Sequence, residues 1–284
     1  MVISYGIAEK KGLRPTMEDA HAIYEDREMD LFSAEIYDGH GGKQPALIAA
    51  EMLTPAFIHG FKIEAKKPVH ERRREADILR DAYLMVDEYV VSRKWEAGTC
   101  AVQLYIIGNH FMAANAGDSR VIIGTGTGVR VLTRDHKPDS EDERSRIEAL
   151  GGHVRTFGVP RVEGVLAISR AIGDTCLKPY VSPEPRIAEG TFGCENDLAV
   201  LACDGVWDVL TPDTVIGIAR AGDSAQDSGD AIAKTALEMG SSDNVTVIVL
   251  DLREYTGKLP NREMSVRDVY DRGLIARNRW DTST

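Results

Sequence analysis

The 284-residue sequence predicts an α+β fold in which antiparallel β-sheets pack face to face and helices cover their outer faces. Short apolar runs recur along the chain, several at hairpin spacing, which is typical of antiparallel strands. Helical periodicity occurs in separate stretches and does not alternate with every strand. Several strands are apolar at nearly every position, so we expect both of their faces to be buried.

The strands are predicted from short runs rich in apolar and β-branched residues. These runs cover residues 3–8, 31–37, 100–107, 111–116, 120–123, 129–132, 197–203 and 245–250. Residues 124–128 read Gly-Thr-Gly-Thr-Gly, but a β-run follows where a dinucleotide-binding loop would start its helix. We therefore interpret this segment as a hairpin turn.

Helices are predicted where apolar residues recur at helical spacing, in residues 43–57, 78–90, 211–220 and 228–239. In the first of these, Pro45 belongs in the first turn, where its missing N–H is tolerated. Thr211 before Pro212 is a helix start, and Gly240 after Met239 is a helix stop.

Composition and charge limit the classes of partner. The chain has 45 acidic and 34 basic residues and a formal charge of -11, so we expect neither a nucleic acid nor a membrane as partner. No apolar run approaches the length of a membrane span, and no signal peptide is evident. The four cysteines show no metal or redox spacing. We therefore expect a cytoplasmic protein, present also in the nucleus if the source is eukaryotic, and a monomer.

The amino-acid composition and the apolar pattern change at residue 252. Residues 1–252 hold every predicted strand and helix, whereas residues 253–284 alternate basic and acidic side chains with little apolar periodicity. We interpret the second part as a charged tail or a surface extension.

Three aspartates lie at the ends of predicted strands. Asp38 follows one strand, Asp204 follows another, and Asp243 precedes a third. Any one of them alone is more often a turn or capping residue. Because a sheet can bring such strand ends together, and bare carboxylates repel one another, the set indicates a cation site. Oxygen ligands without clustered His or Cys favour Mg²⁺ or Mn²⁺ over Zn²⁺, and there is no compact calcium loop.

The order of motifs from about Tyr5 to Leu252 resembles the metal-dependent Ser/Thr protein phosphatases of type 2C. Eight landmarks occur in register: RPTMED at 14–19, DGHGG at 38–42, GTCA at 98–101, GDSR at 117–120, DHKP at 135–138, LAISRAIGD at 166–174, DGVWD at 204–208 and SDN at 242–244. The resemblance implies an α/β/β/α sandwich and hydrolysis of phosphoserine and phosphothreonine in proteins, a signalling activity. The implied partner is a phosphorylated protein.

The resemblance also assigns roles to residues. It implies two tightly bound Mn²⁺ or Mg²⁺ ions that activate a water molecule. Their implied ligands are Asp38, which bridges both ions, the Gly39 carbonyl, Glu18, Asp204 and Asp243, with Asp19 behind them. Some members hold a third, weaker ion, for which Asp118 and Asp208 are the matching acids. The alternative is that Asp118 caps its turn and Asp208 is a first-turn helix acid.

Two further side chains suit the chemistry of phosphoryl transfer. The planar guanidinium of Arg14 can hold two phosphoryl oxygens at once. Histidine is the side chain best suited to exchange a proton at physiological pH, and His40 is therefore the candidate acid for the leaving serine or threonine oxygen. We expect the other histidines, including His136, to be structural.

The cysteines do not support a thiol-based phosphatase, because none has an arginine six residues on. Cys100 and Cys203 lie in apolar runs and are predicted core residues.

The segment 137–165 corresponds to the flap beside the active site in this family. Glu163 stands where many relatives carry an uncharged polar residue, and Phe157 is the only aromatic residue of the segment. Two alternatives to a protein phosphatase remain at this point. One is a catalytically weak module that binds phosphoproteins, and the other is a phosphatase of small phosphoesters.

Overall fold

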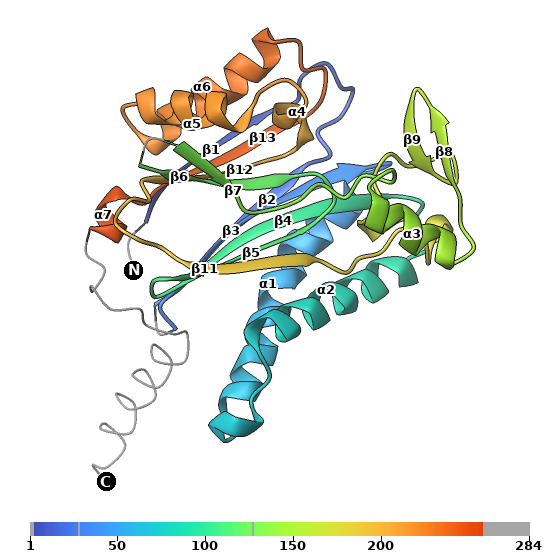
Figure 1. Ribbon diagram of the computed structural model, residues 1–284, viewed down its shortest axis with the longest axis horizontal. Helices are drawn as coiled ribbons and strands as arrows, with labels where there is room; N and C mark the ends of the chain where they lie inside the picture. Colours follow the sequence, from blue (N-terminus) through green and yellow to red (C-terminus); the bar gives the residue numbers. More distant parts are fainter. Residues whose placement is uncertain (1–2, 28, 127, 258–284) are drawn as a thin grey trace.

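The computed structural model describes residues 3–27, 29–126 and 128–257, and these form a four-layered sandwich. Two β-sheets lie face to face, helices α5 and α6 cover one of them, and helices α1 and α2 cover the other (Figure 1). The strands are β1 Ser4–Lys10, β2 Ala20–Asp26, β3 Leu31–His40, β4 Gly98–Ile107, β5 His110–Ala116, β6 Arg120–Thr125, β7 Gly128–Val131, β8 Val154–Phe157, β9 Val159–Val162, β10 Ile172–Gly173, β11 Arg186–Thr191, β12 Leu198–Ala202 and β13 Val245–Asp251.

Both large sheets are antiparallel, as the sequence predicts. The first has the order β1-β13-β12-β6-β7, and the second has the order β11-β5-β4-β3-β2 with β10 paired to β4. The hairpin predicted at residues 124–128 joins β6 to β7. The helices are α1 Gln44–Ala65, α2 Glu75–Ser92, α3 Glu141–Ala149, α4 Asp204–Trp207, α5 Pro212–Ala221, α6 Ala225–Glu238 and α7 Arg253–Thr256, with short 3₁₀ turns at Val69–Glu71 and Thr175–Leu177.

The apolar strands are buried on both faces, and successive side chains point alternately to the other sheet and to the covering helices. On β3, Phe32 and Ile36 face the other sheet, whereas Leu31 and Tyr37 face the helices. Strand β4 is buried along its whole length. The layered arrangement thus explains why these runs are apolar at nearly every position.

Helix α1 lies against the second sheet through Ala49, Leu53 and Phe57. It is also the one described helix long and apolar enough to cross a membrane by length and composition. Its apolar residues include the stripe that packs on the sheet, so burial against the sheet explains much of the apolar composition of the helix. The helix continues eight residues beyond the predicted end at residue 57, to Ala65.

The capping predictions for the last two long helices are confirmed. The hydroxyl of Thr211 accepts a hydrogen bond from the backbone N–H of Thr214. At the end of α6, Gly240 has a φ of +97°, the left-handed conformation that glycine adopts without steric cost. Ser224, which the sequence interpretation missed, caps the start of α6 by accepting from the N–H of Asp227.

The segment 137–165 folds into helix α3 followed by the β8–β9 hairpin, which projects beside the sheets (Figure 1). Helix α3 is held by Glu143, whose side chain is 2% exposed and pairs with Arg146 at 2.9 Å and with Arg170 at 2.6 Å. Burial raises the pKa of Glu143, but the hydrogen bonds from Arg170 and Arg146 outweigh it and bring the pKa to about 2. The pair with Arg146 lies within α3, and the pair with Arg170 anchors the flap to the domain.

Replacing Glu143 by glutamine is expected to loosen the flap and to lower the free energy of unfolding by up to about 3 kcal/mol, because two cations lose their partner. The pKa is depressed, so this contribution is present above the unfolded pKa near 4.5 and is lost as pH falls toward about 2. Hydrogen exchange in residues 141–162 and urea unfolding measure the two effects. Glu148→Gln, which breaks only an exposed pair with Arg144, is the control. Equal losses in both variants would contradict the prediction.

The first residues of the predicted tail belong to the body of the domain. Helix α7 packs through Tyr255, whose ring lies 6.2 Å from that of Phe192, and Thr256 is buried. The rest of the predicted tail, residues 258–284, lies outside the described residues.

Candidate active site

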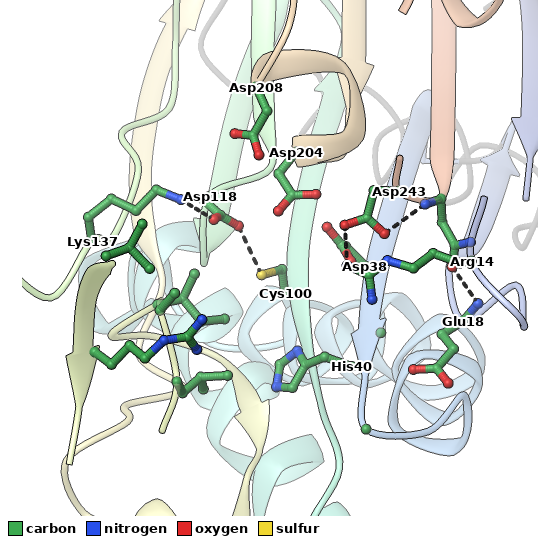
Figure 2. A pocket seen from close by; sticks show the side chains of 18 of the residues that line it. Arg14, Glu18, Asp38, His40, Cys100, Asp118, Lys137, Asp204, Asp208 and Asp243 are labelled. Atoms are coloured by element: carbon green, nitrogen blue, oxygen red, sulfur yellow. Dashed lines mark hydrogen bonds and ion pairs between the residues drawn. The ribbon is translucent and has the colours of Figure 1, made fainter. Parts of the chain in front are cut away.

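An open cleft of about 750 Å³, shown in Figure 2, is lined by residues from many parts of the chain. Every predicted site residue except Asp19 lines it. These lining residues are Arg14, Glu18, Asp38, Gly39, His40, Asp118, Asp204, Asp208 and Asp243. The cleft is therefore the place where segments more than 200 residues apart in the sequence meet.

The three strand-end aspartates come together here. Asp38 lies near the end of β3, Asp204 begins α4 directly after β12, and Asp243 precedes β13. Burial and the neighbouring Asp204 raise the pKa of Asp38 well above its usual range. Burial and Asp118 raise the pKa of Asp204 to about 8. Such mutual repulsion is offset when a cation binds between the carboxylates.

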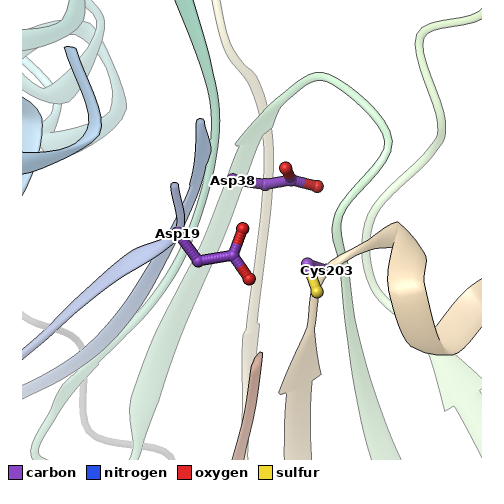
Figure 3. A group of neighbouring side chains, drawn as sticks. All are labelled: Asp19, Asp38 and Cys203. Atoms are coloured by element: carbon purple, nitrogen blue, oxygen red, sulfur yellow. The ribbon is translucent and has the colours of Figure 1, made fainter. Parts of the chain in front are cut away.

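Asp19 lies behind this group, next to Asp38 and Cys203 (Figure 3). Its side chain is buried, and its Oδ2 accepts a 2.6 Å hydrogen bond from the hydroxyl of Thr246. Its Oδ1 is buried without a hydrogen-bond partner. Burial raises the pKa of Asp19 to about 6. An unpartnered carboxylate oxygen among other acids fits a hard divalent cation and the water molecules that such a cation retains.

Gly39 is required by a close approach of two backbone segments. A Cβ atom at this position would lie 2.4 Å from the carbonyl oxygen of Glu18. The carboxylate of Glu18 accepts hydrogen bonds from the Gly42 N–H at 3.1 Å and from the Thr16 hydroxyl at 3.0 Å. In this arrangement Glu18 braces the glycine loop, and its part in metal binding stays a prediction.

Asp118 is buried on the opposite side of the cleft and has two side-chain partners. Lys137 donates to its Oδ2 at 2.5 Å, and the thiol of Cys100 donates to its Oδ1 at 3.3 Å (Figure 2). Asp208 lies at the exposed side of the cleft, near Asp204. Partial burial of its carboxyl group raises its pKa, the charge of Lys137 lowers it and repulsion by Asp118 raises it, so that the net shift is upward.

The sequence interpretation gave Lys137 no role, although it stands within the DHKP landmark. It also described Cys100 only as a core residue, and this was incomplete. Cys100 is buried, yet it lines the cleft beside Asp118. Cys100 reaches the cleft because it lies opposite Asp38 in the β3–β4 pair, a register that no local sequence pattern indicates.

Arg14 and His40 flank the acidic group. The Arg14 guanidinium is exposed at the rim and pairs with Asp243 at 2.5 Å. His40 points into the cleft, and its Nε2 lies 2.8 Å from Asp174 Oδ1. His136, in contrast, is buried, bonded to the backbone of Gly117, and has a pKa lowered by burial to about 4. His136 is therefore neutral at pH 7, as a structural residue would be.

The raised pKa of Asp204 predicts an unusual pH dependence in the metal-free protein. Between about pH 6.5 and 8.5 the folded protein binds more protons than the unfolded chain, in which this group titrates near 3.8, so stability falls as pH rises. A loss on the order of 1 to 2 kcal/mol is expected from the wild type, and a smaller one from Asp204→Asn.

Urea unfolding at the two pH values measures this difference. The window lies above the unfolded pKa of His136 near 6.5, whose lowered pKa gives the opposite slope at lower pH. Saturating Mg²⁺ should remove the pH dependence. Parallel pH profiles of the wild type and the variant would contradict the prediction.

Both the sequence and the fold are similar to those of known proteins. The family model for protein phosphatase 2C matches residues 3–245. A probable protein phosphatase 2C 59 of Arabidopsis thaliana is 35% identical over 257 residues, covering 87% of this chain and 79% of the relative. A probable protein phosphatase 2C 59 of rice, Oryza sativa subsp. japonica, is 34% identical over 267 residues, covering 91% and 79%.

Solved structures show the same architecture. A C. elegans sex determining protein superposes with a TM-score of 0.80 at 28% identity, covering 95% of this chain and 67% of that one. A serine-threonine phosphatase 2C from Toxoplasma gondii superposes with a TM-score of 0.78 at 22% identity, covering 88% and 94%.

The α/β/β/α sandwich with an acidic cleft defines a metal-dependent phosphatase. The chain belongs to the protein phosphatase 2C family. It is a serine/threonine protein phosphatase that depends on Mn²⁺ or Mg²⁺ and acts on phosphorylated proteins.

Proposed function

We propose that Asp38, Gly39, Asp204 and Asp243 hold two divalent cations in the cleft, with Glu18 serving the second cation and Asp19 orienting its water molecules. The observation that carries this proposal is the cluster of carboxylates in one cleft, in which burial and mutual repulsion raise the pKa values of Asp38 and Asp204. When bound, such a pair of cations lowers the pKa of a shared water and neutralises charge on the phosphoryl group. Asp243 would exchange its contact with Arg14 for a cation.

The remaining chemistry belongs to two side chains at the rim. Arg14, freed from Asp243, can direct its planar fork of N–H donors at the phosphoryl oxygens of the substrate. His40 can donate a proton to the serine or threonine oxygen that leaves. Both side chains line the same open cleft.

One assay separates this proposal from its rivals. Phosphate release is measured from a phosphothreonine peptide and from an aryl phosphate, each with and without Mn²⁺. A protein phosphatase is expected to hydrolyse both, and only with metal. Turnover of the aryl phosphate alone would favour a small-phosphoester enzyme. Tight peptide binding without turnover would favour a phosphoprotein-binding module.

We propose that Asp118 and Asp208, with Asp204, hold a third and weaker cation. Lys137 already places a positive charge 2.5 Å from Asp118, which shows that this carboxylate takes a cationic partner. A third cation would compete with that ammonium group, which accounts for its weak binding.

Replacing Asp118 by asparagine is expected to leave the two tight ions bound, to slow phosphopeptide hydrolysis and to raise the metal concentration needed for full activity. Bound manganese is counted by equilibrium dialysis beside the rate. Asp139→Asn removes an equal charge from the exposed rim of the cleft and is the matched control. Unchanged kinetics at low metal with unchanged stoichiometry would return Asp118 to the role of a turn residue.

We also propose that the enzyme acts in signalling as a cytoplasmic monomer. The four cysteines, Cys100, Cys176, Cys194 and Cys203, are all unpaired, which supports a reducing compartment. Fluorescent tagging of the full chain and analytical ultracentrifugation test the location and the oligomeric state.

A further inference from the structure

His40 contacts a buried carboxylate that comes from a distant part of the chain. Its Nε2 lies 2.8 Å from Oδ1 and 2.9 Å from Oδ2 of Asp174. The Asp174 side chain is 3% exposed, whereas His40 is 27% exposed and lines the cleft. No other described residue is hydrogen-bonded to a side-chain atom of His40.

Three neighbouring strands create this contact. His40 on β3 pairs with Gly98 on β4, and Gly98 pairs in turn with Gly173 on β10. A Cβ atom at Gly98 would lie 2.1 Å from Asp174 Oδ2 and 2.7 Å from His40 Nε2. The missing side chain at Gly98 is therefore what lets the imidazole and the carboxylate meet.

Hydrogen bonds of the backbone hold Asp174 in position. Its φ of +54° is a left-handed conformation that is uncommon outside glycine, and its N–H donates to the Ala97 carbonyl at 3.0 Å. The preceding Gly173 N–H donates to Asp87 on α2 at 2.8 Å, and Asp87 pairs with Lys178 at 2.8 Å. A network that reaches from α2 to the strand end thus fixes the position of the carboxylate.

We infer that Asp174 is a positioning residue for the reaction. It accepts the hydrogen bond of His40 Nε2–H, orients the ring and leaves Nδ1 as the atom that gives its proton to the substrate. This inference rests on the proposed function of His40 as the acid.

The proton balance follows from this arrangement. As water forms its bond to phosphorus and the bond to the serine or threonine oxygen breaks, the proton on Nδ1 passes to that oxygen. The ring becomes neutral and keeps its Nε2 proton, which stays hydrogen-bonded to Asp174. The protons of the attacking water remain on the phosphate product or pass to solvent, and solvent then reprotonates Nδ1. Asp174 remains a carboxylate throughout and stabilises the charged ring before transfer.

Asp174→Asn tests the inference, because asparagine tolerates the left-handed backbone and keeps the shape. The asparagine amide can donate an N–H to Nε2, which favours the neutral ring that carries its proton on Nδ1 and not on Nε2. We expect a loss on the order of 10- to 100-fold on phosphothreonine peptide and less than about 3-fold on an aryl phosphate, whose leaving group needs no proton. Glu96→Gln, a change of an exposed carboxylate near Ala97 that does not contact His40, is the control.

The double variant with His40→Ala decides between positioning and structure. If Asp174 acts through His40, adding Asp174→Asn to His40→Ala causes no further loss. Additive losses, or an equal loss of Asp174→Asn on both substrates, would overturn the inference.

The ring nitrogens of His40 give an independent reading in the Mg²⁺-loaded enzyme. ¹⁵N NMR should show Nε2 protonated in the neutral wild-type ring and a shift toward protonated Nδ1 in Asp174→Asn. If His40→Ala itself shows no leaving-group dependence, the proposed role of His40 fails. The position of the ring proton still tests the role of Asp174 in that case. If the same nitrogen is protonated in the wild type and in Asp174→Asn, the inference is overturned, and if the proton moves to Nδ1, it is supported.

Discussion

Exhaustive removal of divalent cations is expected to abolish hydrolysis of phosphothreonine peptide, and Mn²⁺ or Mg²⁺ is expected to restore it. Asp38, Asp204 and Asp243 line the cleft and, in the proposed mechanism, hold the cations that ionise the attacking water. Two cations supply several kcal/mol of transition-state stabilisation, so their removal should cost on the order of 10³-fold or more in rate. Phosphate release after chelation and dialysis measures this loss.

Thermal unfolding of the same samples provides a control for simple loss of fold. Because the cations bind the native state and not the unfolded chain, added metal should raise the melting temperature. The metal-free protein should still unfold cooperatively. Inhibitors of the other class of Ser/Thr phosphatases should have little effect. Full turnover in the chelated, dialysed sample would rule out the two-cation mechanism.

Replacing His40 by alanine is expected to slow hydrolysis of phosphoserine peptide by about 10²- to 10⁴-fold, because an alkoxide leaves poorly without a proton. An aryl phosphate, whose leaving group is stable as an anion, should lose much less. The rate of each variant is therefore plotted against the pKa of the leaving group. The slope should become steeper in His40→Ala.

The control is His59→Ala, which removes an exposed histidine from α1, outside the cleft. It should leave both rates unchanged. Equal losses on alkyl and aryl substrates in His40→Ala would mean that His40 supports the cation site and does not act as the acid.

The sequence predicts the layers and the meeting of the acids because both depend on local patterns. Short runs that are apolar at nearly every position identify the buried strands, and Asp38, Asp204 and Asp243 stand at their ends. Strand order then brings these ends to one cleft. The prediction of a cation site follows from this pattern, whereas the prediction of a Ser/Thr protein phosphatase follows from the resemblance of the ordered motifs to that family.

Elements with weak apolar patterns were missed. Helix α3 buries only Glu143 and Ile147, so it shows no helical periodicity in its sequence. Strand β2 lies at a sheet edge and is half-buried, and its sequence mixes polar and apolar residues. Strand β11 is an edge strand of the same kind.

Contacts between distant side chains could not be predicted at all. His40 and Asp174 are 134 residues apart, and nothing in either motif specifies that they meet across Gly98. The same holds for the ion pair of Lys137 with Asp118. Such contacts depend on strand register and on the packing of loops, which a single sequence does not encode in any local pattern.

The pairing of β1 with β13 has a consequence for how the protein is made. Residues 4–10 find their partner only in residues 245–251, and β13 is also the strand that joins β1 to the rest of its sheet. During synthesis from the N-terminus, the edge of β1 therefore waits unpaired until almost the whole domain has left the ribosome. Asp243 emerges just ahead of β13, so the cleft gains its last acidic side chain as the sheet closes. A nascent chain that stops before residue 243 would be inactive and would expose β1 to aggregation.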